Sequence, residues 1–305
     1  MVSELPLVIF TIIAQMSVGS FVVLGFIHLL AARSGRDLVD RVSDPALYAI
    51  GPILALGLIL SMLHLGTPIR AINALGHLGT SWLSREILFG LLFAALGGAF
   101  ALCQWFRWLT PLLRQVLAGG AALVGLALIW SMTMVYRLPT VPAWDSWATP
   151  VRFFATTFLL GSMAVGAALV ITAGLRRRGG VVADAGSNAV IMTSLRGIAI
   201  GAIAMLGVEF VALPLYLGSL GTAGSVATTT SADALATTYG AYAALQLVLV
   251  FLGVALLGLF LSRLVRPFSN ARFVAMAQIA AFALVFTGEL IGRMLFYASY
   301  ARVGL

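Results

Sequence analysis

Long apolar stretches separated by short polar links run through the whole chain. About 20 consecutive apolar residues cross the hydrocarbon core of a bilayer, and eight stretches reach that length. We expect these stretches to form transmembrane helices at residues 5–32, 45–64, 84–106, 111–136, 151–175, 190–218, 238–262 and 270–298. The pattern predicts an all-α integral membrane protein with a single domain over residues 1–305. The first stretch is longer than the core of a signal peptide, so we expect it to remain as a spanning helix.

Arginines in the links predict the orientation of these helices, because positive charges gather on the cytoplasmic side. Eleven arginines lie in the links that follow the first, third, fifth and seventh helices, and five lie on the opposite side. This bias predicts that both termini are periplasmic. A weak repeat, Gly19-Ser20 in the first helix and Gly161-Ser162 in the fifth, suggests two four-helix halves. Further glycines, Gly119, Gly120, Gly125 and Gly201 among them, are expected at helix contacts.

Composition and charge agree with a membrane protein and argue against other classes. The chain is 61% hydrophobic and only 9% charged, which is too little charge to cover a soluble domain of this size. The net charge of +8 comes from arginine alone, and the arginines lie at helix ends rather than on one basic face. Nucleic-acid binding is therefore not expected. Cys103 is the only cysteine, so the chain has no four-cysteine iron–sulfur or metal site.

Polar side chains at the outer ends of the first four helices form a candidate site, because burying such groups in lipid is costly. His64 ends the second helix and is followed by Gly66 and Pro68, which form a turn. The residues that share this outer level are Gln15, His64, Arg85, Glu86, Tyr136 and Arg137. An imidazole, a carboxylate, an amide and a phenol suit an amphipathic ligand with polar ends, and a quinol is such a molecule.

Oxidation of a quinol releases two protons, which need acceptors within hydrogen-bonding reach. An imidazole accepts a proton near neutral pH, so His64 is one candidate, and Glu86 is the other acceptor or relay. Haem is not expected, because its two axial ligands must lie at the same depth. His28 lies near the inner end of the first helix, a membrane thickness from His64.

A second group of ionisable residues lies in the sixth and eighth helices. Glu289 and Arg293 are four residues apart, which places them on one helical face and predicts a structural ion pair. Glu209 has no charged partner in its own helix, so we expect any partner to come from across the bundle.

Six stretches carry a resemblance to a known family. They are PLVIFTIIAQ, SMLHLGTPIRAIN, LSREI, VYRLPTVPAW, TPVRFF and GELIGRMLFY, in this order along nearly the whole chain. The protein resembles the membrane-anchor subunit of dimethyl sulfoxide reductase, within the wider group of eight-helix quinol-interacting anchors of molybdoenzymes. The link LPTVPAW is closer to the general anchor pattern, which leaves the terminal electron acceptor open.

The resemblance implies a function. Such anchors oxidise menaquinol and pass electrons to an iron–sulfur subunit, which feeds a molybdopterin catalytic subunit. His64 and Glu86 match the quinol site, and the anchor holds neither haem nor an iron–sulfur cluster. The protein would lie in the cytoplasmic (inner) membrane of a bacterium, among its lipids, with a periplasmic docking face. The residues expected to dock the iron–sulfur subunit come from two outer links: Thr67, Pro68, Arg70, Asn73, Thr140, Pro142 and Trp144.

Two other interpretations stay open. A secondary transporter needs polar groups near the middle of the membrane and broken helices, for which Gln15, Arg196 and Pro214 are candidates. A purely structural anchor would oxidise no quinol at this chain, so replacing His64 or Glu86 would leave quinol oxidation intact. The gathering of polar groups at one face favours a surface site over the transporter.

Overall fold

The computed structural model describes residues 5–30, 38–48, 51–53, 75–180, 185–263 and 271–303, which are helical apart from short links and contain no strand. Seven helices are long and apolar enough to cross a membrane. They are α1 (Leu5–Leu30), α4 (Trp82–Trp105), α5 (Pro111–Tyr136), α6 (Ala148–Arg178), α7 (Ala185–Thr222), α9 (Gly240–Arg263) and α10 (Ala271–Ala298). Shorter elements are η4 (Leu75–His77), α8 (Val226–Asp233) and η5 (Ala234–Thr238), and residues 38–48 and 51–53 are also helical.

These seven helices confirm seven of the eight expected spans. The remaining expected helix, 45–64, is helical at 45–48 and 51–53, and its other residues lie outside the described ranges. Residues 219–237, which connect the sixth and seventh expected spans, are largely helical, because α7 continues to Thr222 and α8 and η5 follow. The side chain of Ser225 accepts a hydrogen bond from the backbone N–H of Thr228 and so caps the start of α8.

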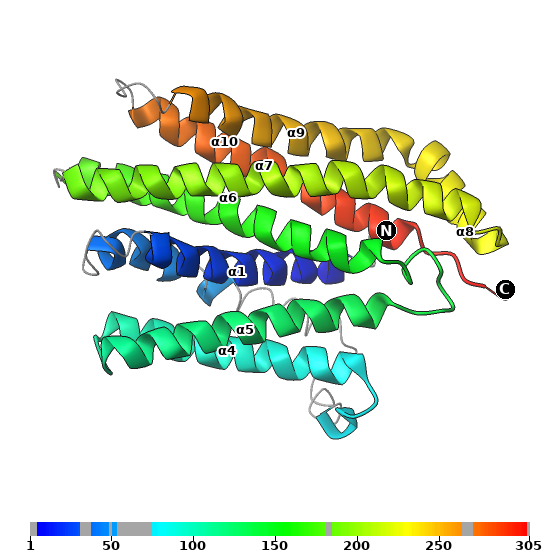
Figure 1. The fold of residues 1–305 in the computed structure, drawn as a ribbon, viewed down its shortest axis with the longest axis horizontal. Coiled ribbons are helices and arrows are strands. Elements are labelled where there is room, and N and C mark those ends of the chain that lie inside the picture. The colour runs from blue at the N-terminus through cyan, green and yellow to red at the C-terminus, as the bar shows by residue number, and fades with distance from the viewer. Residues whose placement is uncertain are drawn as a thin grey trace.

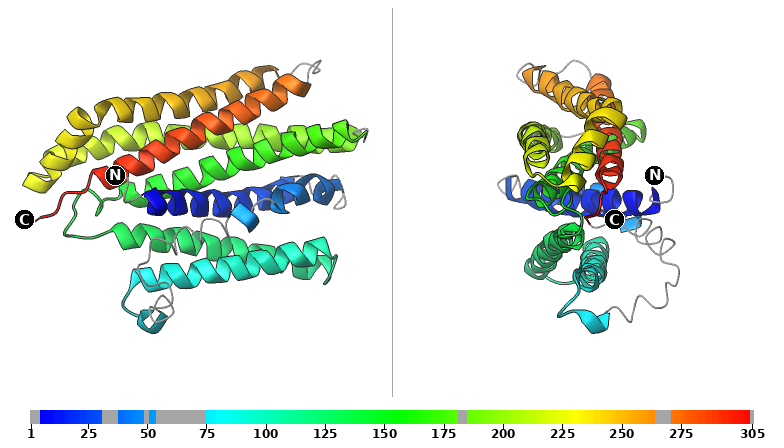
Figure 2. Two further views of the ribbon diagram at one scale, coloured as in Figure 1. Left: turned by 180° about the vertical axis from the view of Figure 1, so that it is seen from behind. Right: turned by 90° about the vertical axis from the view of Figure 1, so that its right-hand side faces the viewer.

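The long helices lie side by side as an antiparallel bundle (Figure 1). α1 and α6 run through its middle, with α4 and α5 on one side and α9 and α10 on the other (Figures 1 and 2). α1 packs against α5, α6 and α10, and most of it is buried. A helix surrounded by other helices needs apolar residues on every side, which explains why the α1 sequence shows no polar face.

The helices begin and end at two opposite ends of the bundle. α4 and α6 begin, and α5 and α10 end, at what we call the site end (Figure 1). The opposite end, where α4 and α6 end and α5 begins, is called the arginine end. There Arg107 donates to Asp40 at 2.8 Å and also contacts Asp44 at 3.4 Å. Gln104 donates to Asp44 at 3.0 Å. Desolvation by burial raises the pKa of Asp44. These contacts join residues 38–48 to the turn between α4 and α5.

Close contact between α1 and α6 depends on two glycines. A Cβ atom on Gly19 would overlap the carbonyl oxygen of Thr157, and one on Gly161 would overlap the backbone of Gly19. The weak repeat in the sequence therefore marks the point where the two central helices cross. Gly125 also contacts neighbouring side chains closely.

The packing role expected for Gly119, Gly120 and Gly201 is wrong for the described part of the chain. No described atom lies within 4 Å of a Cβ placed at any of the three positions. The sequence does not distinguish a glycine on the outside of a bundle from one at a helix crossing. The two differ only in whether another helix packs against them.

Candidate functional site

Polar side chains from four helices meet at the site end of the bundle. The hydroxyl groups of Tyr136 on α5 and Tyr297 on α10 are hydrogen-bonded to each other at 2.5 Å. Glu86, in the first turns of α4, is near enough for its charge to act on both tyrosines. Gln15 of α1 completes the group. The predicted shared level of Gln15, Glu86 and Tyr136 is therefore a cluster in three dimensions, and Tyr297 belongs to it.

Arg293 connects this cluster to α1 and α6 in the middle of the bundle. Its Nη2 donates to Oε1 of Gln15 at 2.6 Å, and Nε2 of Gln15 donates to the carbonyl oxygen of Phe153 at 2.8 Å. The guanidinium carbon lies 3.7 Å from the centre of the Phe153 ring, a cation–π geometry. Gln15 is fully buried and Arg293 is 6% exposed. Both side chains are thus held in fixed positions.

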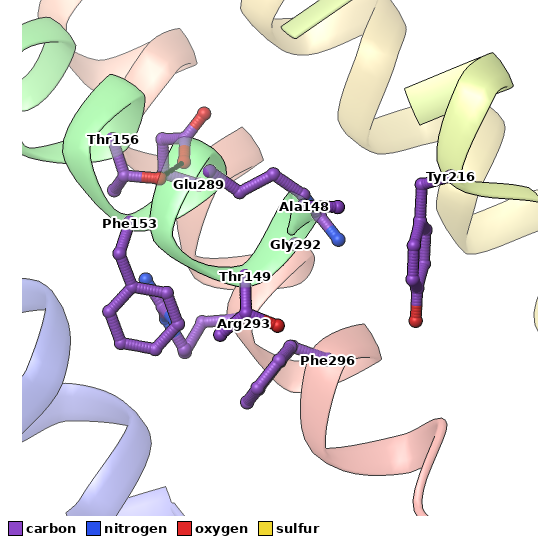
Figure 3. A pocket seen from close by; sticks show the side chains of 10 residues that line it. Ala148, Thr149, Phe153, Thr156, Tyr216, Glu289, Gly292, Arg293 and Phe296 are labelled. Carbon is purple, nitrogen blue, oxygen red and sulfur yellow. Dashed lines mark hydrogen bonds between the residues drawn. The ribbon is translucent and has the colours of Figure 1, made fainter. Parts of the chain in front are cut away.

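The predicted ion pair between Glu289 and Arg293 is corrected by these contacts. Oε2 of Glu289 accepts a hydrogen bond from the hydroxyl of Thr156 at 2.6 Å, whereas Arg293 donates to Gln15. No salt bridge joins Glu289 to Arg293 in the described part of the chain. Spacing of four residues puts both side chains on one face of α10, but Glu289 bonds to Thr156 of α6 (Figure 3) and Arg293 bonds to Gln15 of α1.

Trp144 closes the cluster from the link between α5 and α6. Its indole ring stacks on Phe296 with the ring centres 5.3 Å apart and meets Tyr136 edge-on at 5.6 Å. Its Nε1–H donates to the carbonyl oxygen of Phe296 at 2.8 Å. The ring of Trp144 is partly buried and packs against this protein's own aromatic residues, and its docking role stays a prediction.

Two arginines that we expected to contact the ligand bond to residues of the links beside them. Arg85 donates to the carbonyl oxygens of Leu78 and Gly79 at 2.8 and 2.9 Å, and so fixes the turn before α4. Arg137 is exposed and pairs with Asp145 at 3.1 Å. Both interpretations are corrected by these contacts, since each guanidinium is committed to the loop beside it.

The remaining predicted residues fall into two groups. In the link between α5 and α6, Thr140 is exposed and Pro142 is partly exposed, and the Thr140 carbonyl accepts from the backbone N–H of Val303 at 3.0 Å. The others lie outside the described residues: His64, Thr67, Pro68, Arg70 and Asn73.

The sequence held signals for two residues that were missed. Tyr297 follows Arg293 by four residues and shares its helical face. Phe153 lies in the stretch TPVRFF that carried the resemblance, but nothing in its spacing indicates that its ring lies under a guanidinium group.

Replacing Trp144 by Ala is expected to destabilise the isolated anchor by about 2 kcal/mol, less than the ~3–5 kcal/mol for a fully buried aromatic ring, because Trp144 is partly buried and its stacking on Phe296 is lost. Replacing Trp144 by Phe keeps the ring stacking and loses one hydrogen bond, at a cost of about 1 kcal/mol. Thermal unfolding of the purified protein in detergent measures both. Unchanged unfolding of the Ala variant, together with lost partner binding, would support the docking role.

Fold and site together define a class: a multi-pass helical membrane protein whose buried polar groups gather towards one end of the bundle. Within that class the chain belongs to the family of DMSO reductase anchor subunits (DmsC), whose family model matches residues 1–299. It is an anchor subunit of a DMSO reductase-family molybdoenzyme, and such an anchor implies catalytic and electron-transfer partner subunits.

Individual relatives support this assignment. The protein is 33% identical over 303 residues to a chain of the anaerobic dimethyl sulfoxide reductase of Escherichia coli, and the match spans 99% of this sequence and 96% of that one. It is 32% identical over 302 residues to the anaerobic dimethyl sulfoxide reductase chain YnfH of the same organism, with the same coverage. A shorter match, 34% identical over 127 residues, spans 37% of this sequence and 38% of a sulfite dehydrogenase subunit of Allochromatium vinosum. The family is thus shown over nearly the full length.

Proposed function

We propose that this anchor binds and oxidises menaquinol at the site end and passes the electrons to an iron–sulfur subunit. The observation that carries the proposal is the hydrogen-bonded pair of Tyr136 and Tyr297, with Glu86, in the first turns of α4, near enough for its charge to act on both. A carboxylate and two phenols supply acceptors and donors for the two ring oxygens of a quinol. The aromatic side chains around them suit its flat ring.

Each polar group has a role in this proposal. Glu86 accepts one proton of the quinol, and His64 accepts the other and hydrogen-bonds the quinol oxygen. The tyrosine pair orients the ring through its hydroxyl groups. Arg293, held by Gln15, adds a positive charge near the oxygen that becomes negative as the first proton leaves. The anchor itself supplies no haem or iron–sulfur cluster, so the electrons leave directly for the partner.

The topology that we propose has eight spanning helices and two periplasmic termini. α1 and α4 both begin at the site end (Figure 1), so the segment between Leu30 and Trp82 crosses the bundle once more. Arg107 follows the end of α4, Arg114 lies in the first turn of α5, and Arg176 to Arg178 lie in the last turn of α6, all at the opposite end. The positive-inside rule then makes that end cytoplasmic and the site end periplasmic. Pairing of the eight helices into two four-helix halves remains part of the proposal.

The proposed docking face for the iron–sulfur subunit is the outer surface of the two links at the site end. Thr140, Pro142 and Trp144 are its described members, and Thr67, Pro68, Arg70 and Asn73 belong to the same face in the proposal. Proline lowers the entropy that a free loop loses when a partner binds. The iron–sulfur subunit passes electrons to the molybdopterin catalytic subunit, and that subunit sets the terminal acceptor.

Binding of a fluorescent quinol analogue to the purified, assembled complex tests the proposal. His64→Arg is expected to abolish the quenching of the analogue while all subunits stay attached. His77→Arg is the matched control, because His77 is an exposed histidine in the same outer link, and it is expected to bind as the wild type does. Unchanged binding in His64→Arg moves the quinol elsewhere and leaves the outer corner as a docking surface.

The alternative of a secondary transporter loses its main candidate feature. Pro214 lies inside α7, which is helical without a break from Ala185 to Thr222, so this helix is not one of the broken helices that transporters use. Solute uptake by the isolated protein in liposomes would support the transporter. Quinol oxidation that survives His64→Arg and Glu86→Gln would support a purely structural anchor.

A further inference from the structure

Two carboxyl groups from different helices meet inside the bundle. Glu209 on α7 and Glu289 on α10 lie close enough for each carboxyl group to act on the other, although they are 80 residues apart in the sequence. They are 9% and 3% exposed. Two ionised carboxylates buried this close together repel each other, and neither has an N–H or O–H to offer the other unless one of them carries a proton. Their burial side by side therefore favours one proton in the pair.

The hydrogen bonds of Glu289 support the same conclusion. Its Oε2 accepts from the Thr156 hydroxyl at 2.6 Å, but its Oε1 is buried without a hydrogen-bond donor among the described residues. A buried carboxylate oxygen without a donor is costly. A proton on the Glu209 side removes this cost.

The charges that face the pair come from two helices. Arg152 on α6 and Arg293 on α10 both act on Glu209, and Arg152 also acts on Tyr216 of α7. Two ionised carboxylates in contact repel each other, which is the reason why paired acids in active sites share a proton. The two arginines keep one of the carboxylates charged, so the pair with one proton is the stable resting form.

A small cavity lies beside Glu289. It has a volume of about 20 Å³ and is lined by Arg152, Thr156, Tyr216, Glu289 and Arg293, among others. Figure 3 shows Glu289 and Arg293 on α10 next to Thr156, with the Tyr216 ring across from them. A cavity of about 10–15 Å³ on this measure already holds a water molecule if polar groups bind it. The site therefore has room for one water.

The cavity shares a wall with the proposed quinol site. Phe153 and Phe296 line the cavity and also pack against Tyr136 of the tyrosine pair. Arg293 lies between the two sites: it is close enough to interact with Tyr136 and Tyr297 on one side and with Glu289 on the other. A proton thus has only a short distance to travel between them.

We propose that Glu209 and Glu289, with one water in the cavity, form a proton-holding site that takes up a proton released by quinol oxidation. This inference rests on the proposed quinol oxidation for the source of the proton, but not for the existence of the site. The pair holds one proton at rest, accepts as a second the proton that Glu86 has taken from the quinol, and then releases it towards the outer side past Arg152. The two electrons of the quinol leave separately for the iron–sulfur subunit.

Infrared spectroscopy of the assembled complex tests the site without any quinol. The wild type is expected to show the carbonyl stretch of a protonated carboxylic acid that shifts in D₂O. Glu209→Gln and Glu289→Gln are each expected to lose it, because the remaining carboxyl then ionises beside an arginine. Asp233→Asn, an exposed acid on α8 at the same end, is the control and keeps the band. A wild type without this band, or a band that persists in both Gln variants, overturns the proposal.

Turnover then tests the link to the quinol. Glu289→Gln is expected to slow quinol oxidation severalfold and to increase its solvent isotope effect, while binding of the quinol analogue stays as in the wild type. Wild-type turnover in a variant that has lost the band would overturn the relay role. If the complex oxidises no quinol at all, the proposed function fails, and the infrared band still decides whether the proton site exists.

Discussion

Glu86→Gln is expected to lower menaquinol oxidation by at least about 100-fold while the anchor still assembles with its partners. The amide keeps the shape of the side chain but accepts no proton. Glu86 is the carboxylate that acts on both Tyr136 and Tyr297, so its loss leaves the phenols without a basic group beside them. Quinol oxidation with the purified complex, followed by absorbance, measures the effect.

The control for this experiment is Asp233→Asn, which makes the same acid-to-amide change at an exposed position at the same end. It is expected to leave the rate unchanged. An active Glu86→Gln complex would show that the carboxylate is not the acceptor and would favour the purely structural anchor. A slow variant that still binds the quinol analogue would place the defect in proton transfer rather than in binding.

Gly161→Leu is expected to be the most destabilising single change in the fold. Any side chain at this position overlaps the backbone of Gly19 on α1, and the backbones of two central helices do not move aside in the way that flexible side chains do. Overpacking an ordinary core costs about 1–3 kcal/mol, and we expect a loss at or above the upper end of that range. Thermal unfolding of the protein in detergent measures it.

Gly201→Leu is the matched control, because Gly201 is exposed on α7 and no described atom lies within 4 Å of a Cβ at this position. It makes the same change in a helix of similar apolar character and is expected to unfold as the wild type does. Equal stability of Gly161→Leu and Gly201→Leu would show that α1 and α6 do not cross as closely as described.

The positions of seven spanning helices could be predicted from the sequence. The cost of exposing backbone polar groups to lipid forces helices, and the thickness of the bilayer sets their length. Both constraints act on each segment separately, so they can be read without knowing its neighbours. The helices within residues 219–237 were not predicted, because they are too short and too polar to meet the criteria of length and apolar character for a spanning helix.

The candidate site was predictable only in part. Depth along each helix placed Glu86 and Tyr136 at one level, and Glu86 does lie near enough for its charge to act on Tyr136. Depth does not tell which way a side chain points around its helix, and Arg85 and Arg137 were assigned to the ligand although each bonds to its own link. Tyr297 was missed because its partner, Tyr136, lies 161 residues away.

By itself, the sequence determined the class of the protein, its spans and the end at which its polar groups gather. Only the tertiary structure decided which partner each polar group has. Glu289 pairs with Glu209 and Thr156 rather than with Arg293, and Gly161 matters where Gly201 does not. The physical reason is the same in each case. Insertion into lipid depends on a segment's own residues, whereas a hydrogen bond or a helix crossing depends on atoms of another helix that no local pattern records.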